Sequence, residues 1–152
     1  IKVNGLADTE TVRALCRASQ AGVPIDLIVR GICTLRPGVA RWSTGIRVLS
    51  VVGRFLEHSR IYRFANGGAP EYFVGSSDLR PRNLRRRVEL LVPVPDPEHR
   101  LRLDEILERY LNDPTAWELR ADGQYLQRRG PGESAQSRFA VQPVHFLRHD
   151  VS

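Results

Sequence analysis

The sequence of 152 residues predicts one α/β domain with a mixed, largely parallel sheet flanked by helices. Two short runs at 23–31 and 46–52 are almost wholly apolar, which is typical of parallel strands buried on both faces. Segments with helical spacing of apolar residues alternate with such strands. A hydrophobic content of 41% and a charged content of 26% are those of a folded globular chain.

The first half of the chain is predicted to form three strands and one helix. Residues 1–5 are expected to be the end of a strand. Asp8 can cap a helix that runs to about residue 20, and Gly22 can end it because glycine accepts a left-handed backbone. The two apolar strands at 23–31 and 46–52 follow.

A hairpin is predicted next, with strands at 60–66 and 71–77 and a turn at the Asn-Gly-Gly of 66–68. Residues 87–94 are expected to form another buried strand. Residues 97–111 give the clearest helix, because their apolar side chains recur at helical spacing.

The last predicted hairpin turns at Asp122 and Gly123. We assign residues 1–137 to the domain and expect residues 138–152 to be a terminal helix or a flexible tail. The chain begins at Ile1 and contains no methionine, so we expect it to be part of a longer protein.

The charge predicts an anionic partner. Lysine and arginine number 23 against 17 acidic residues, for a net charge of +6, and Lys2 is the only lysine. Guanidinium groups bind phosphate oxygens through two parallel hydrogen bonds, which an ammonium group cannot do. The sequence has no apolar run of the ~20 residues needed to span a bilayer. We expect a cytoplasmic location that allows membrane association.

Polar side chains follow several predicted strands, at the position where open α/β sheets bind ligands. Arg30 and Gly31 follow the first apolar strand, and His58 lies in the loop after the second. The Gly-Ser-Ser-Asp of 75–78 ends a hairpin strand and offers amides and hydroxyls for an anion. Arg87 precedes a predicted buried strand, which would fix its position. The sequence therefore predicts a phosphate site at Arg30, His58 and Arg87.

The densest cationic segment, residues 78–87, contains five arginines and a single acid, Asp78. For Arg80, Arg85 and Arg86, a solvated surface and a phosphate contact are both open. His58 taken alone could be a structural or exposed loop histidine. At a phosphate site it could accept a phosphoryl group, transfer a proton or bind as a cation.

No metal site is predicted in this chain, because the histidines and cysteines have no metal-ligand spacing. The remaining histidines are expected to be structural or on the surface; they are His99, His145 and His149.

Several motifs closely resemble those of the last domain of bacterial polyphosphate kinases. They are RGIC (30–33), RPGV (36–39), FLEHSR (55–60), NGG (66–68) and PRN with RRVE (81–89). The resemblance covers the chain to about residue 137. It implies a phospholipase-D-like fold that forms the C-terminal half of a catalytic core. Enzymes of this family reversibly transfer the terminal phosphate of ATP to inorganic polyphosphate with Mg²⁺, whose ligands we do not expect in this chain.

The resemblance also implies roles for individual residues. Arg30 and His58 match residues of the nucleotide and phosphate site, and Arg87 is assigned to the same phosphate-binding group. The histidine that becomes phosphorylated lies in the preceding domain of the family, so His58 has a supporting role. The implied partners are ATP or ADP, inorganic polyphosphate, the preceding catalytic domain and further copies in a homo-oligomer. The isolated chain is expected to be inactive.

Two other functions fit part of the sequence, a phosphodiesterase and a nucleic-acid-binding module. A phospholipase-D-like phosphodiesterase needs the motif H-x-K-x-x-x-x-D, but Arg60 stands at the lysine position and Ala65 at the acid position. A basic nucleic-acid-binding module would fit the charge, yet no aromatic platform or recognised motif accompanies it. We therefore expect no specific nucleic-acid partner.

Overall fold

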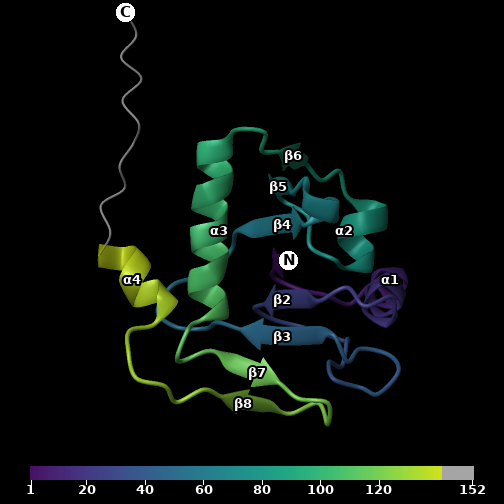
Figure 1. Ribbon diagram of the computed structural model, residues 1–152, viewed down its shortest axis with the longest axis horizontal. Helices are drawn as coiled ribbons and strands as arrows, with labels where there is room; N and C mark the ends of the chain where they lie inside the picture. Colours follow the sequence, from purple (N-terminus) through teal and green to yellow (C-terminus); the bar gives the residue numbers. More distant parts are fainter. Residues whose placement is uncertain (142–152) are drawn as a thin grey trace, which may run out of the picture.

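The computed structural model describes residues 1–141; residues 142–152, most of the predicted tail, lie outside the described residues (Figure 1). The strands are β1 (Lys2–Val3), β2 (Ile25–Val29), β3 (Ile46–Ser50), β4 (Arg60–Phe64), β5 (Glu71–Gly75), β6 (Leu91–Pro93), β7 (Trp117–Leu119) and β8 (Tyr125–Gln127). The helices are α1 (Thr9–Gln20), α2 (Pro81–Arg86), α3 (Pro97–Leu111) and α4 (Ala135–Val141), with a 3₁₀ turn η1 (Asn66–Gly68).

The α/β prediction is confirmed, but the sheet is largely antiparallel, which corrects the predicted strand directions. Its order is β6-β5-β4-β1-β2-β3-β7-β8, seen from top to bottom in Figure 1. Only β1–β2 and β2–β3 are parallel. The five other pairs are antiparallel. Two of these pairs, β4–β5 and β7–β8, are hairpins, whose strands are joined by a short turn and must run in opposite directions. The two hairpins also pair with β1 and β3 in antiparallel orientation.

Helices cover both faces of the central strands, and α1 and α3 lie on opposite sides in Figure 1. Leu27 and Val29 of β2 pack in the core beneath α1, with Val12 and Leu15 from that helix. Ile28, which points the other way, packs in a second core with side chains of α3 and α4. β2 is therefore buried on both faces, as its apolar run predicted.

The two long helices begin where the sequence places a cap. Asp8 accepts a hydrogen bond from the Thr11 amide (2.9 Å) at the start of α1, and Asp96 accepts from the Glu98 amide (2.8 Å) at the start of α3. The turn of the β7–β8 hairpin contains Gly123 at φ +90°. The longest helix, α3, has 15 residues, and within residues 1–141 no helix has the length and apolar character to cross a membrane.

The predicted buried strand at 87–94 is wrong in both extent and burial. β6 covers Leu91–Pro93 alone, and all three residues are exposed because β6 is an outermost strand of the sheet. Arg87 is exposed and ends α2, four residues before β6 begins. A short apolar run has the same composition in a central strand and in an edge strand, so the sequence could not separate them.

The predicted site lies where the central strands end, a border of the sheet that we call the sheet edge. The carboxyl ends of β1, β2 and β3 lie there, and the antiparallel pairing of Lys2 with Ile61 brings the start of β4 to the same edge. The pairing of Arg60 with Gly75 adds the end of β5. Arg30 and the loop that carries His58 therefore share this edge.

Candidate functional site

His58 is exposed in the loop 51–59, and its ring is held by Arg60. Arg60 Nη1 lies 3.1 Å from His58 Nδ1 and donates to the His58 carbonyl at 2.9 Å. The same guanidinium forms an ion pair with Asp78, at 3.2 Å through both Nε and Nη2. The arginine at the lysine position of the broken phosphodiesterase motif is thus a support for the histidine, which the sequence reasoning missed.

The contact with Arg60 also fixes the tautomer of His58. A guanidinium has no acceptor, so His58 Nδ1 must accept the hydrogen bond. The hydrogen of the neutral imidazole is then on Nε2. In this state His58 presents an N–H donor, which suits a phosphate oxygen.

Asp78 anchors this arrangement from a buried position. Besides Arg60, it accepts a hydrogen bond from the backbone amide of Asn4 at 2.7 Å. Burial alone would raise the pKa of Asp78, but the hydrogen bonds from Arg60 and Asn4 outweigh it and lower this pKa below its ordinary value. Asp78 is therefore a fixed anion that orients Arg60.

Arg30 follows β2 directly. Its carbonyl accepts a hydrogen bond from Ser50 Oγ at 3.0 Å, which holds the backbone of the strand end. Its Nη1 atom is buried and has no hydrogen-bond partner among residues 1–141. A buried donor without a partner is costly, and an anionic oxygen would satisfy it. The side chain lines a small void together with Lys2 and Glu57, next to the His58 loop.

Lys2 is a further cation at this edge that the sequence reasoning did not select. It is only 2% exposed. Its Nζ donates to the Ser59 carbonyl (3.0 Å) and hydroxyl (2.9 Å), and it lies 3.5 Å from Glu57 Oε2. Burial lowers the pKa of Lys2, and Glu57 opposes that shift. Lys2 therefore fixes the residue that follows His58.

Arg87 lines a groove of about 760 Å³ that we call the arginine groove. It is lined by Ala7, Ile32, Arg80, Pro81, Arg82, Arg85, Arg86 and Arg87. Of these cations, Arg85 forms an ion pair with Asp8 (2.5 Å), and Arg80 packs against the backbone of Gly5. Arg82, Arg86 and Arg87 are exposed. The structure thus brings Arg30 and His58 to one edge, and Arg87 lines the arginine groove, which also contains Ile32, two residues after Arg30.

The predicted anion cradle at 75–78 is already occupied by contacts within the protein. The Ser76 amide donates to the Leu90 carbonyl at 3.0 Å. The Ser76 hydroxyl bonds Glu89, and Asn83 Nδ2 donates to the same carboxylate at 2.6 Å. These contacts lower the pKa of Glu89. The segment supports β6 and Asp78 and offers no open cradle.

Within the part of the chain that the structure describes, no three histidine, cysteine, aspartate or glutamate side chains gather where they could hold a metal ion. The carboxylates nearest to His58 are already engaged, Asp78 by Arg60 and Glu57 by Lys2. These residues do not fit a magnesium site.

Comparison with known proteins gives a consistent result. Residues 1–139 match the family described as polyphosphate kinase C-terminal domain 2. The chain is 56% identical over 149 residues to a polyphosphate kinase of Thermosynechococcus vestitus, covering 97% of this chain and 20% of that protein. It is 57% identical over 128 residues to one of Streptomyces coelicolor, covering 84% and 17%.

The crystal structure of polyphosphate kinase from Porphyromonas gingivalis superposes with a TM-score of 0.85 at 42% identity. The superposition covers 90% of this chain and 22% of that one. The chain thus spans about a fifth of the length of the curated relatives it matches.

Proposed function

The chain belongs to the polyphosphate kinase family, whose C-terminal domain 2 it matches, and from this membership we propose that it forms the C-terminal domain of such a kinase. The whole enzyme would reversibly transfer the terminal phosphate of ATP to inorganic polyphosphate. This domain would supply residues that bind the nucleotide and the phosphate chain.

One observation carries the proposal at the level of the site. At a single sheet edge, Arg30 has a buried Nη1 without a partner, and His58 is exposed with its ring held by Arg60. His58 is an oriented N–H donor of the kind that stabilises developing charge on a phosphoryl group without reorganising, and Arg30 Nη1 adds an N–H that has no partner within the described residues. Arg30 would bind phosphate oxygens, and His58 would donate from Nε2.

The remaining roles follow from family membership. The histidine that carries the phosphoryl group would come from the preceding domain, and His58 would assist it. Arg87 would contact phosphate from the arginine groove. Magnesium would be bound by groups outside the described residues.

We propose ATP or ADP, inorganic polyphosphate, the preceding domain and further copies of the protein as partners, and the cytoplasm as the location. The division into a domain at 1–137 and a tail at 138–152 stays part of the proposal. α4 already includes residues 138–141.

Binding measurements on a full-length kinase that carries this chain test the site. Arg30→Ala and His58→Ala should each weaken the binding of ADP or short polyphosphate about 10- to 100-fold, the effect of losing one charge-assisted hydrogen bond. The matched controls are Arg13→Ala and His99→Ala, because both residues are exposed on helices. Calorimetry showing unchanged affinity in both site variants, with folding intact, would reject the assignment.

A second measurement concerns the isolated chain. It should neither form ATP from ADP and polyphosphate nor consume ATP, because the phospho-acceptor histidine is supplied by another domain. ATP formation by the purified chain would contradict this.

A competition experiment distinguishes the proposed function from nucleic-acid binding. Short polyphosphate should displace a bound oligonucleotide if the basic surface binds polyphosphate, whereas a dedicated nucleic-acid module would retain the oligonucleotide.

A further inference from the structure

The loop 51–59 carries His58 between β3 and β4 and contains no helix or strand of its own. Most of its side chains are exposed, including Phe55 and Leu56. A loop with few buried apolar contacts opens easily unless other groups hold its backbone. The position of His58 therefore depends on the polar contacts made by its neighbours.

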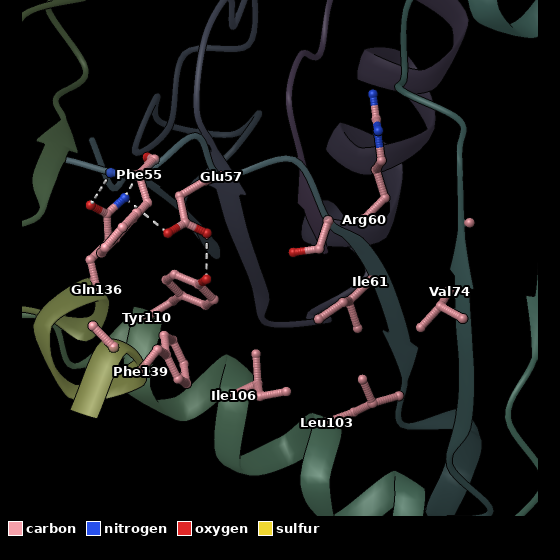
Figure 2. A pocket seen from close by; sticks show the side chains of 13 residues that line it. Phe55, Glu57, Arg60, Ile61, Val74, Leu103, Ile106, Tyr110, Gln136 and Phe139 are labelled. Atoms are coloured by element: carbon pink, nitrogen blue, oxygen red, sulfur yellow. Dashed lines mark hydrogen bonds between the residues drawn. The ribbon is translucent and has the colours of Figure 1, made fainter. Parts of the chain in front are cut away.

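Gln136 of α4 makes the most extensive of these contacts (Figure 2). It is 5% exposed. Its Oε1 accepts from the Phe55 amide at 3.0 Å, and its Nε2 donates to the Phe55 carbonyl at 2.8 Å. The side-chain amide thus pairs with both backbone groups of one loop residue, as a neighbouring strand would.

The same Nε2 also donates to Glu57 Oε1 at 2.9 Å, directly before His58. The other carboxylate oxygen of Glu57 accepts from the Tyr110 hydroxyl of α3 and lies near Lys2. Because Lys2 binds Ser59, the residues on both sides of His58 are held. Gln136 reaches one of them directly.

The loop is also shaped to receive Gln136. A Cβ atom at Gly53 would lie 2.5 Å from Gln136 Oε1, so no larger residue fits there without moving the glutamine. Gly53 has no left-handed backbone that would by itself require glycine. A larger side chain at this position would therefore disturb the contact with Gln136 and not the backbone conformation.

α4 itself is fixed to the rest of the domain. The Ala135 amide donates to Oδ2 of the buried Asp113 at 2.8 Å, and Phe139 packs against Tyr110 with ring centroids 5.3 Å apart. Together with α3 and the β4–β5 hairpin, α4 borders an open, mainly apolar pocket of about 760 Å³, which Glu57 and Gln136 also line (Figure 2). Gln136 is thus a rigid support.

We propose that Gln136 is a positioning residue for His58, which makes α4 a functional part of the phosphate site. This inference rests on the proposed function, since it assumes that His58 binds phosphate. Gln136 touches no phosphate itself. It holds Phe55 and Glu57 so that the imidazole is presented in one orientation.

A double-mutant cycle in the full-length kinase tests the inference. Gln136→Leu keeps the side-chain volume but removes all three hydrogen bonds. It should weaken ADP or short-polyphosphate binding up to the loss produced by His58→Ala, about 10-fold or more. In the His58→Ala background it should cause no further loss, because the residue that it positions is gone. Ser137→Ala, exposed on the same helix, is the control.

Each outcome decides a separate point. Equal losses from Gln136→Leu in both backgrounds would show a general structural role and overturn the inference, and so would unchanged binding in the wild-type background. Wild-type binding in His58→Ala would overturn the proposed role of His58 and the inference with it. If Gln136→Leu fails to fold, Gly53→Ala displaces the same amide from the loop side and takes its place in the cycle.

Discussion

The domain has two cationic regions that differ in how their charges are held. At the sheet edge, Arg60 is tied to Asp78, and Lys2 to Ser59 and Glu57. In the arginine groove, Arg82, Arg86 and Arg87 are exposed on and just after the short helix α2. The edge has fewer cations, but Lys2 and Arg60 are held in position by these partners.

This difference separates attraction from positioning. Exposed arginines attract a polyanion over a distance set by salt, about 8–10 Å at physiological ionic strength. They lose side-chain entropy when they bind, so each does little to fix the position of a bound phosphate. Donors held by buried partners are already ordered and can orient a phosphoryl group. The groove, although it has the higher charge density, is therefore the weaker candidate for chemistry.

The largest effect should come from removing Asp78, the carboxylate that holds Arg60 at the sheet edge. Asp78→Ala leaves Arg60 in a largely buried position without its counter-ion and frees the Asn4 amide. We expect the free energy of unfolding to fall by about 3 kcal/mol. Urea unfolding of the chain, followed by circular dichroism, measures it. Asp26→Ala is the control, because its ion pair with Arg47 is exposed and should be worth less than about 1 kcal/mol. Equal losses in the two variants would remove the contrast between fixed and exposed pairs.

Lowering the pH should also show how much Asp78 contributes to stability. The pKa of Asp78 is lowered in the folded state, so this carboxylate stabilises the fold above the ordinary aspartate pKa of about 3.9 and loses that contribution as pH falls below it. Through this group the melting temperature should fall below about pH 4. In Asp78→Asn the fall should be shallower. A parallel fall in both proteins would show that Asp78 contributes nothing to acid sensitivity.

Removing charge from the groove should change binding only moderately. The triple substitution of Arg82, Arg86 and Arg87 by alanine should weaken polyphosphate binding several-fold in the full-length kinase and make it less salt-dependent, because fewer counterions are exchanged. Titrations at two salt concentrations measure both changes. Arg30→Ala, which removes one cation, should lower the salt dependence less than the triple substitution does. A groove variant whose affinity falls equally at all salt concentrations would place fixed contacts in the groove.

The smallest effect on binding is expected for Arg85. Its ion pair with Asp8 is half exposed on the arginine side, but Asp8 itself is buried, so Arg85→Ala should cost about 1–2 kcal/mol of unfolding free energy, less than Asp78→Ala. Polyphosphate affinity should change little, because this guanidinium is already paired. Thermal unfolding and calorimetry on one preparation measure both. A loss of affinity as large as that of the triple variant would show that Arg85 leaves Asp8 to bind phosphate.

Much of the fold could be predicted because it depends on neighbours in the chain. Asp8 and Asp96 begin the two long helices, and Gly123 lies in the turn of the last hairpin. α3 was predicted with its observed bounds, because helical periodicity is a local property. α2 was missed, although Pro81 at its first turn was a usable signal.

The candidate site was predictable in part. Arg30 and His58 follow strands, and the rule for ligand positions in α/β sheets places both at one edge. The groups that fix His58 are far apart in sequence: Asp78 lies 18 residues from Arg60, and Gln136 lies 81 residues from Phe55. No local pattern encodes such pairs.

By itself, the sequence determined the helices, the hairpins, the apolar central strands, the cationic character and the family resemblance. Each of these is set by residue type and by spacing along a few turns or one strand. The tertiary structure alone decided that most strand pairs are antiparallel, that β6 is an exposed outermost strand, that Arg87 lines the arginine groove and that Gln136 reaches the His58 loop. These features depend on which distant segments meet, and that is set by the packing of the whole chain around its two cores.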